Sequence, residues 1–420
     1  MIPKDELNSR RLRFLKGMEP NSVAILFSGE PKIMSLDEDY KFEVNRNFYY
    51  LTGIEQENSI LLLVKTEGEE KAILFISSYD ENKEKWYGKK LTIEEAKEIS
   101  SINNVLISPS FQPRLESLIK DENYPIKNIY FDSDPELKIG PALFVDGFIK
   151  TLSLSYPSLA FKELNPIITR LRMVKSKYEV CEFVKAIETT RQGIKLVMAE
   201  TRGGAKEYEL VSTFLKAIND DNGYQGESFN TIMASGVNAT TLHYPNPQGI
   251  CKTGELLLMD LGARHNYYCA DISRTIPVGG KFNEYQKMVY EIVLGANKAV
   301  ARFAKPGVTL KELNELAKEY LASECLEKGI ISNKEDISKY YFHSISHHIG
   351  LDTHDLSDRD LPLEEGNIIS DEPGLYIKEK GIGIRIEDDL LITSTGAEVL
   401  SSSILKEIDE IESFYKLGKQ

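Results

Sequence analysis

The sequence predicts a mixed α/β protein with two domains. In residues 1–165, apolar runs typical of buried strands alternate with amphipathic helical patterns; the runs are 23–28, 48–53 and 59–64. This alternation favours a sheet covered by helices on both faces. After residue 173 the pattern changes to long amphipathic helices followed by strand-like runs. A length of 420 residues agrees with more than one domain.

The boundary between the domains is predicted within a polar, proline-containing stretch at 155–166, which divides the chain into residues 1–165 and 166–420. In the second domain, two helix pairs share an interior glycine, Gly193 or Gly295, then a glycine-containing break, then a helix that begins with Lys-Glu. This likeness indicates an internal duplication, although two helix hairpins can also look alike by chance.

The composition excludes some classes of partner. Hydrophobic residues make up 41% of the chain and charged residues 28%, which is an ordinary globular composition. Asp and Glu outnumber Lys and Arg by 65 to 51, and the basic residues form no stripe, so we expect no nucleic-acid partner. No apolar run reaches the length of a membrane span, and the charged N-terminus does not resemble a signal peptide. Four cysteines without a Cys-x-x-Cys pair predict a cytoplasmic protein.

Residues 255–275 are predicted to form a β-hairpin with an aspartate on each strand. Asp260 ends an apolar run, and Asp271 lies among aromatic and β-branched residues. If His265 and Asn266 form the loop, the two aspartates are directly opposed, with Cβ atoms roughly 5 Å apart. Carboxylates that close repel each other, and a divalent cation between them resolves the repulsion. The alternative is a surface hairpin with two solvated acids.

Histidines cluster in one short polar stretch. The chain has six histidines, and four of them lie close together in the sequence: His343, His347, His348 and His354. A lone histidine is usually a core or surface residue, but such a cluster is unusual, and neutral imidazole is a common metal ligand. The spacing is not that of a zinc-binding helix, so the stretch is predicted to be a loop or strand.

Two glutamates follow in strand-like contexts. A short apolar run leads to Glu372, and the proline after it holds Glu372 in an extended conformation. Further on, Arg385, Glu387 and Asp389 alternate with apolar residues, so the three polar side chains share one strand face. Taken singly, each acid could lie on a solvated face.

Together these residues form a set suited to two metal ions: Asp260, Asp271, His347, Glu372 and Glu387. The four carboxylates balance the charge of two divalent cations. Oxygen-rich ligation with a single imidazole suits Mn²⁺ best, and Co²⁺ or Zn²⁺ can substitute. A site of two metal ions about 3.5 Å apart bridges a hydroxide and polarises a carbonyl group.

This ordered set resembles the metal site of the pita-bread metallopeptidases, which include methionine aminopeptidase, prolidase, aminopeptidase P and creatinase. The matching motifs, in order, are Leu-Met-Asp-Leu-Gly, Ala-Asp-Ile-Ser-Arg-Thr, His-x-x-Ser-His, Glu-Pro-Gly-Leu-Tyr and Arg-Ile-Glu-Asp. Residues 48–53 and 86–91 are similar to the first domain of aminopeptidase P. The resemblance implies a creatinase-like N-terminal α/β domain and a C-terminal pita-bread fold with an internal pseudo-twofold duplication.

The resemblance also implies an activity and a role for each ligand. The activity is that of a metalloaminopeptidase, a hydrolase that releases the N-terminal residue from peptides with proline in the second position. Asp271 and Glu387 would bridge the two metal ions. Asp260 would complete one metal site, and His347 with Glu372 would complete the other.

Further roles follow from the same resemblance. Glu372 would carry the proton from the bridging water to the leaving proline nitrogen. His243 and His354 would stabilise the tetrahedral intermediate. His343 would line the substrate pocket, and Arg385 would contact the neighbouring ligand or a substrate carbonyl.

The single tryptophan, Trp86, lies in a polar segment with little apolar cover and is a candidate interface anchor. In the family, the matching tryptophan can reach the active site of a neighbouring subunit. We therefore expect a homodimer or homotetramer in which Trp86 helps to close the peptide pocket. The alternative is that Trp86 packs against its own domain.

Several positions depart from the family pattern without removing a ligand: Ser344, His348, Asp371, Cys269 and the pair 43–44. We expect His348 to be a solvated neighbour and not a ligand. The departures leave the preferred substrate length open. Prolidase, which cuts only dipeptides, is the closest alternative activity. Creatinase-like hydrolysis and a non-catalytic relative that binds peptides or proteins are further alternatives.

Overall fold

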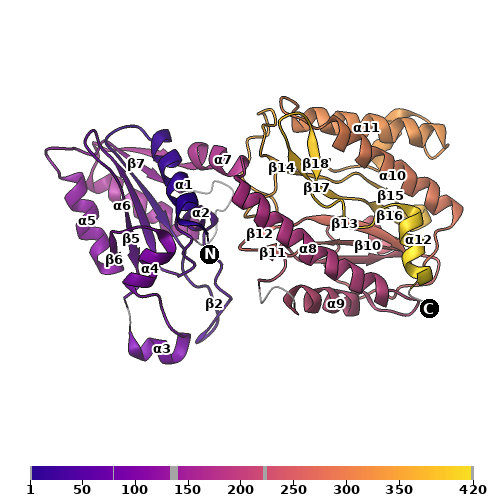
Figure 1. Cartoon of the computed structure of the whole chain (residues 1–420), viewed down its shortest axis with the longest axis horizontal. Helices are drawn as coiled ribbons and strands as arrows, with labels where there is room; N and C mark the ends of the chain where they lie inside the picture. The colour runs from indigo at the N-terminus through magenta and orange to yellow at the C-terminus, as the bar shows by residue number, and fades with distance from the viewer. Residues whose placement is uncertain (1, 79, 133–140, 221–224, 418–420) are drawn as a thin grey trace. The chain divides into compact units, whose positions relative to one another are not determined.

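The computed structural model describes residues 2–78, 80–132, 141–220 and 225–417 of the chain. These residues form two compact units, Met1–Leu171 and Arg172–Gln420 (Figure 1). The mixed α/β architecture predicted from the sequence is confirmed. Within the described ranges, no helix is both long and apolar enough to cross a lipid bilayer.

The first unit is built on a six-stranded sheet in the order β6-β5-β4-β1-β7-β8. Its strands are β1 Ser22–Phe27, β4 Ile60–Lys65, β5 Glu70–Ile76, β6 Val105–Ile107, β7 Asn128–Phe131 and β8 Ala160–Glu163. Two further short strands, β2 Ile33–Ser35 and β3 Glu38–Asp39, pair in a separate hairpin. The helices are α1 Lys4–Gly17, α2 Arg46–Thr52, α3 Glu81–Tyr87, α4 Ile93–Ser100, α5 Phe111–Ile119, α6 Pro141–Ser155 and α7 Asn165–Met173, which continues into the second unit. Alternate side chains of β1 and β4 pack against α5 and α6, and the intervening ones are also buried, so both faces of the sheet are covered.

The apolar run at 48–53 forms helix α2, so the predicted strand there is wrong. The Asn45 side chain accepts a hydrogen bond from the Phe48 N–H and caps the helix, and Gly53 ends it in the left-handed conformation. Six consecutive residues of this helix are buried. A short helix buried on all sides has the same continuous apolar pattern as a buried strand, so periodicity could not separate the two.

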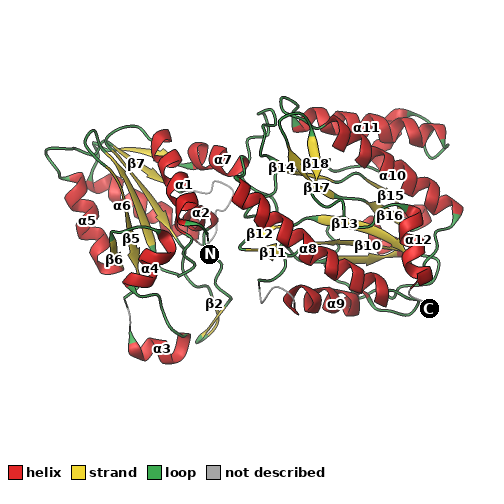
Figure 2. Cartoon of the chain, in the orientation of Figure 1, coloured by secondary structure: helices red, strands yellow, loops and turns green. Residues whose placement is uncertain are grey.

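The second unit contains two helix pairs, each followed by a long β-ribbon (Figure 2). The helices are α8 Lys177–Glu200, α9 Glu207–Asp220, α10 Glu284–Phe303, α11 Leu310–Glu327 and α12 Ile408–Leu417. The first ribbon comprises β10 Leu256–Leu261, β11 Arg264–His265, β12 Tyr268–Cys269 and β13 Ile272–Pro277, with β9 Ile232–Ser235 beside β10. The second ribbon comprises β14 Ile368–Asp371, β15 Gly374–Ile377, β16 Ile382–Arg385 and β17 Asp388–Ile392, with β18 Ala397–Val399 beside β17. The interior glycines that the sequence shares between the helix pairs lie at equivalent crossings: a Cβ on Gly193 would strike Phe214 of α9, and one on Gly295 would strike Tyr320 of α11.

The register of the first ribbon differs from the predicted one. The turn residues are Asn266 and Tyr267, both with positive φ, as a two-residue hairpin turn requires. Asp260 therefore pairs with Ser273 and not with Asp271. The physical reason is the anchoring of Asn266, whose N–H donates to Gln225 Oε1 at 2.6 Å and whose Nδ2 donates to Glu182 Oε2 at 2.7 Å.

The shift leaves the two aspartates on one face. Moving the turn by one residue moves the cross-strand partner by two, and side chains alternate with a period of two. Asp260 and Asp271 are therefore diagonal neighbours instead of a directly opposed pair. Gly262 has the position across from Asp271, and a Cβ on Gly262 would collide with the Ala270 carbonyl group.

We predict that Gly262→Ala destabilises the second unit, because the added methyl group meets backbone that cannot rotate away. The expected loss in the free energy of unfolding is about 1–3 kcal/mol, measured by denaturant titration. Gly396→Ala is the matched control, because a Cβ on Gly396 would meet nothing within 4 Å. Equal stability of the two variants would contradict the close approach of the strands at Gly262.

Candidate metal centre

The two ribbons of the second unit are joined where their acidic residues lie. The Glu387 N–H donates to the Ser273 carbonyl at 3.0 Å, and the Arg385 N–H donates to the Thr275 hydroxyl at 3.2 Å. Each ribbon supplies two of the predicted carboxylates: one supplies Asp260 and Asp271, and the other supplies Glu372 and Glu387. The acid-bearing faces of the two ribbons therefore meet in one region of the second unit.

Two buried carboxylates and a half-buried imidazole form the centre of the site. Ligand atoms of Asp271, His347 and Glu387 all lie within 4.8 Å of one another. His347 Nε2 is 3.4 Å from Asp271 Oδ2 and 3.5 Å from Glu372 Oε1. Asp260 and Glu372 thus flank this group, and the structure brings all five residues of the predicted set to one region.

Asp260 is oriented by Arg385. The Arg385 Nη2 donates to Asp260 Oδ2 at 2.6 Å. The other oxygen, Asp260 Oδ1, is buried and has no hydrogen-bond partner among the described residues. A buried carboxylate oxygen without a donor is costly unless a cation or another donor meets it. The donor set, with four carboxylates and one imidazole, therefore fits divalent cations.

The protonation of these groups reflects their crowding. Burial raises the pKa of Asp271 and of Glu387, and the nearby carboxylates raise both further. Burial also raises the pKa of Glu372 to about 7. Burial opposes the charge of His347, but hydrogen bonding and charge attraction from Asp271, with attraction from Glu372, raise its pKa to about 9. Burial and crowding with like charges cause the shifts of the three acids, opposite charges cause that of His347, and bound cations would reverse these shifts.

Two serines hold the glutamates in place. The Ser273 hydroxyl donates to Glu387 Oε2 at 2.7 Å, and the Ser370 hydroxyl donates to Glu372 Oε1 at 3.2 Å. The Ser370 oxygen also accepts the His347 N–H at 3.0 Å. Sequence analysis did not find these serines, because a strand serine carries no signal of its own. Each serine holds one oxygen of its carboxylate, as partners behind metal ligands commonly do.

The ring of His347 is aimed at the acids. Its Nδ1 lies 3.2 Å from the His348 carbonyl, which leaves Nε2 directed at Asp271 and Glu372. His348, by contrast, is buried, and its backbone bridges to Ile369 of β14. The expectation of a solvated His348 is wrong. Neighbouring side chains of an extended segment point to opposite sides, so when His347 faces the site His348 enters the core.

His343, Tyr376 and Arg385 form a wall beside the acids. His343 Nε2 is 2.9 Å from the Tyr376 hydroxyl, which also accepts a hydrogen bond from Arg385 Nη1 at 2.9 Å. Burial lowers the pKa of His343 to about 4, so the ring is neutral. The exposed ring of Phe342 lies 5.3 Å from the Tyr376 ring. Tyr376 is a site residue that the sequence analysis did not single out, although it ends the Glu-Pro-Gly-Leu-Tyr motif.

The other two predicted histidines lie around the centre. The His354 ring packs edge-on against His347, with 4.4 Å between ring centroids. Burial lowers the pKa of His354 to about 4, and the charges of His347 and His243 lower it further. His243 is exposed in the loop that follows the 3₁₀ helix Gly236–Thr240. Trp86 is on α3 of the first unit, and 78% of its surface is exposed.

Comparison with known families matches two parts of the chain. The model of metallopeptidase family M24 matches residues 182–394, and the model of the aminopeptidase P N-terminal domain matches residues 7–127.

Individual relatives match nearly the whole length. The Xaa-Pro aminopeptidase of Haemophilus influenzae is 34% identical, over 98% of this chain and 97% of its own. A solved structure from Bacillus anthracis is 41% identical, with a TM-score of 0.95 over 99% of each chain. Aminopeptidase P from Escherichia coli, solved with the inhibitor Pro-Leu, is 29% identical, with a TM-score of 0.91 over 100% of this chain and 99% of that one.

We predict opposite effects for the two adjacent histidines. His347→Ala removes the imidazole aimed at the acids, so the affinity for Mn²⁺ is expected to fall on the order of 100-fold or more, with little loss of stability. His348→Ala empties a core position, so it is expected to cost about 1–3 kcal/mol of stability and to keep the metal affinity. Isothermal titration with Mn²⁺ and thermal unfolding separate the two effects. The reverse pattern would show that the histidine loop is assigned incorrectly.

Proposed function

We propose that this chain, which belongs to metallopeptidase family M24 and is a metal-dependent aminopeptidase, releases the N-terminal residue from peptides whose second residue is proline. One observation carries the proposal: the group of Asp271, His347 and Glu387, whose two carboxylates are buried, flanked by Asp260 and Glu372. The match to relatives named Xaa-Pro aminopeptidase over nearly the whole chain supports the choice of substrate.

The proposed cofactors are two divalent cations, with Mn²⁺ preferred and Co²⁺ or Zn²⁺ able to replace it. Asp271 and Glu387 occupy the centre of the residue group and would be shared, Asp260 would complete one site, and His347 with Glu372 would complete the other. When bound, such cations supply an activated water and polarise the carbonyl of the scissile peptide bond.

Glu372 is the proposed proton carrier. Glu372 Oε1 lies 3.5 Å from His347 Nε2 at the edge of the metal group, where a carboxylate can take a proton from the attacking water and return it to the leaving proline nitrogen. The Ser370 hydroxyl holds one of its oxygens, so the proton acceptor has a fixed place.

Neutral imidazoles are the proposed donors to the substrate. The low pKa of His354 keeps its ring neutral, and a neutral ring still donates one N–H to the oxygen that becomes negative in the tetrahedral intermediate. We assign the same task to His243, in the loop after the 3₁₀ helix Gly236–Thr240. His343, held by the Tyr376 hydroxyl, and the exposed ring of Phe342 form a surface against which a proline ring can pack. This surface is apolar and has hydrogen-bonding groups at its edge.

We predict that a chelator abolishes hydrolysis of a Xaa-Pro-Yaa tripeptide and that Mn²⁺ restores it better than Co²⁺ or Zn²⁺. The reason is the ratio of four carboxylates to one imidazole. The measurement is the release of the first residue after each metal is added back singly to metal-free protein, with a Xaa-Ala-Yaa peptide as the matched control.

The same assay separates the alternatives. Faster cleavage of a Xaa-Pro dipeptide than of the tripeptide would identify a prolidase, and turnover of creatine would identify a creatinase-like hydrolase. Full activity of the metal-free protein would overturn the proposed metal site, and binding of peptides without turnover under any metal would identify a non-catalytic relative.

The proposed assembly is a homodimer or homotetramer in the cytoplasm. Trp86 is exposed together with its neighbour Tyr87, and the β2–β3 hairpin of the same unit exposes Ile33, Met34 and Leu36. Exposed apolar side chains in such number are typical of interaction surfaces. A neighbouring subunit's Trp86 would then help to close the peptide pocket. The four free cysteines support a reducing compartment.

We predict that Trp86→Ala weakens self-association and raises KM for the tripeptide while metal content stays unchanged. The physical reason is the loss of a large apolar anchor from an exposed helix. Sedimentation velocity gives the assembly state and elemental analysis gives the metal content. Tyr124→Ala is the control, because Tyr124 is an exposed aromatic residue of the same unit outside α3 and the hairpin. A stable, fully active monomeric wild type would exclude the proposed role.

A further inference from the structure

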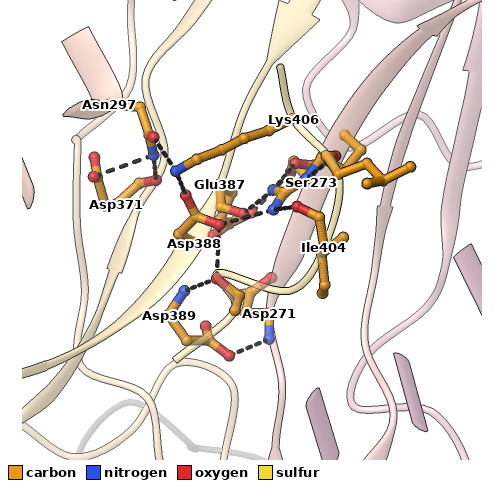
Figure 3. A network of polar contacts seen from close by, with 12 residues as sticks. Asp271, Ser273, Asn297, Asp371, Glu387, Asp388, Asp389, Ile404 and Lys406 are labelled. Carbon is orange, nitrogen blue, oxygen red and sulfur yellow. Dashed lines mark hydrogen bonds and ion pairs between the residues drawn. The ribbon is translucent and has the colours of Figure 1, made fainter. Parts of the chain in front are cut away.

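Each glutamate ligand has an aspartate next to it in the chain: Asp371 precedes Glu372, and Asp388 follows Glu387. These two aspartates form a second pair, on the opposite face of the ribbon. In the second ribbon Asp371 pairs with Asp388, and Gly374 pairs with Arg385 in the same register, so Glu372 and Glu387 lie between these two pairs. Side chains alternate along a strand, so the aspartates point away from the face that carries the glutamates. Figure 3 shows Asp371 and Asp388 on a buried polar network with Asn297 and Lys406.

Asp388 is the charged centre of this network. It is fully buried, and Arg274 Nη2 and the Ser401 hydroxyl donate to its Oδ1 at 2.8 Å and 2.6 Å. The Lys406 ammonium contacts its Oδ2. Two cations against one buried carboxylate keep Asp388 ionised, and removing one of them leaves the carboxylate less well compensated.

Lys406 also reaches the other strand of the ribbon through Asn297 of α10. Its Nζ donates to Asn297 Oδ1 at 2.8 Å, which fixes which end of the amide faces the strand. The Asn297 Nδ2 then donates to the Asp371 backbone carbonyl at 3.3 Å and to Asp371 Oδ2 at 3.2 Å. That carbonyl belongs to the peptide group that joins Asp371 to Glu372.

The peptide group beside Glu387 is held from the same network. Arg274, which is paired with Asp388, donates Nη1 to the Glu387 carbonyl at 2.5 Å. Its remaining donors meet the Ile404 and Leu405 carbonyls at 3.2 Å and 3.0 Å. Segment 401–406 is therefore linked to the peptide groups beside both glutamates, through Arg274 on one side and through Asn297 on the other. Lys406 is the side chain that links the two halves.

We propose that Lys406 is a positioning residue that sets the spacing of the two glutamate ligands, Glu372 and Glu387, and thereby the affinity of the site for its metal pair. It touches neither substrate nor metal ligand side chain, and acts through Asp388 on one strand and Asn297 on the other. The inference rests on the proposed function, because it assumes that the two glutamates bind metal.

The test uses the full chain with Lys406→Met, Lys406→Arg and the control Lys298→Met. Lys298 follows Asn297 on α10 and pairs with Glu407 at 2.7 Å, so the control removes a neighbouring lysine ion pair on the surface and leaves the network intact. The readouts are calorimetric titration of the metal-free proteins with Mn²⁺, kcat and KM on the tripeptide at saturating Mn²⁺, and thermal unfolding.

Lys406→Met is expected to lower the Mn²⁺ affinity about 10- to 100-fold, the usual effect of losing a partner behind a metal ligand. At saturating Mn²⁺ we expect kcat to fall and KM to change little, because the substrate wall is untouched. Lys406→Arg regains part of the affinity, since a guanidinium can donate to both Asp388 and Asn297. Lys298→Met matches the wild type.

An unchanged Mn²⁺ affinity in folded Lys406→Met, with only a lower melting temperature, would overturn the inference and leave the proposed function standing. A wild type that takes up no Mn²⁺ would overturn both. If Lys406→Met does not fold, the Mn²⁺ affinity of Asn297→Ala tests the inference instead. That variant removes the link from Lys406 to the Asp371 carbonyl without removing a charge. The wild-type affinity in that variant would overturn the inference.

Discussion

The carboxylates of Asp260, Asp271, Glu372 and Glu387 share one desolvated region, and their mutual repulsion is the constraint around which the second unit is arranged. Two unit charges 4 Å apart repel by roughly 4 kcal/mol at the effective dielectric of a protein. Arg385 offsets part of this by its ion pair with Asp260. The raised pKa values of the remaining acids show that the compensation by protein groups is incomplete. A site in this condition has a thermodynamic reason to take up cations.

Such a site needs a rigid frame, because the carboxylates repel one another and would otherwise move apart to lower their electrostatic energy. Two β-ribbons supply the frame, and the backbone hydrogen bond from Glu387 to Ser273 joins them. Because side chains alternate between the two faces of a strand, each ligand residue has a chain neighbour whose side chain points away from the metal site. In the second ribbon those neighbours are Asp371 and Asp388, which extend the rigidity of the site to α10 and to segment 401–406. The metal-binding face and the buried network are thus two sides of one ribbon.

Sequence reasoning recovered the chemistry of the site more fully than its geometry. The five proposed ligands were identifiable because clustered histidines are unusual and because the acids and His347 occur in motifs that follow the order of a known family. Their convergence was not derivable from spacing, since it depends on how two ribbons more than one hundred residues apart pack together. The supporting groups, such as Ser273 and Ser370, were missed because their role exists only through those long-range contacts.

The errors have the same origin. The contacts of Asn266 with Gln225 and Glu182 decided the turn at Asn266 and Tyr267, and no local turn preference would have placed an aromatic residue there. Burial of six residues in a row, not strand pairing, explains the apolar run that forms α2.

By itself the sequence determined the residue types, the alternation that puts both aspartates on one face, and the membership of the family. Register, the burial of His348 and the network behind the glutamates were decided by tertiary structure, because each depends on long-range contacts of the side chains.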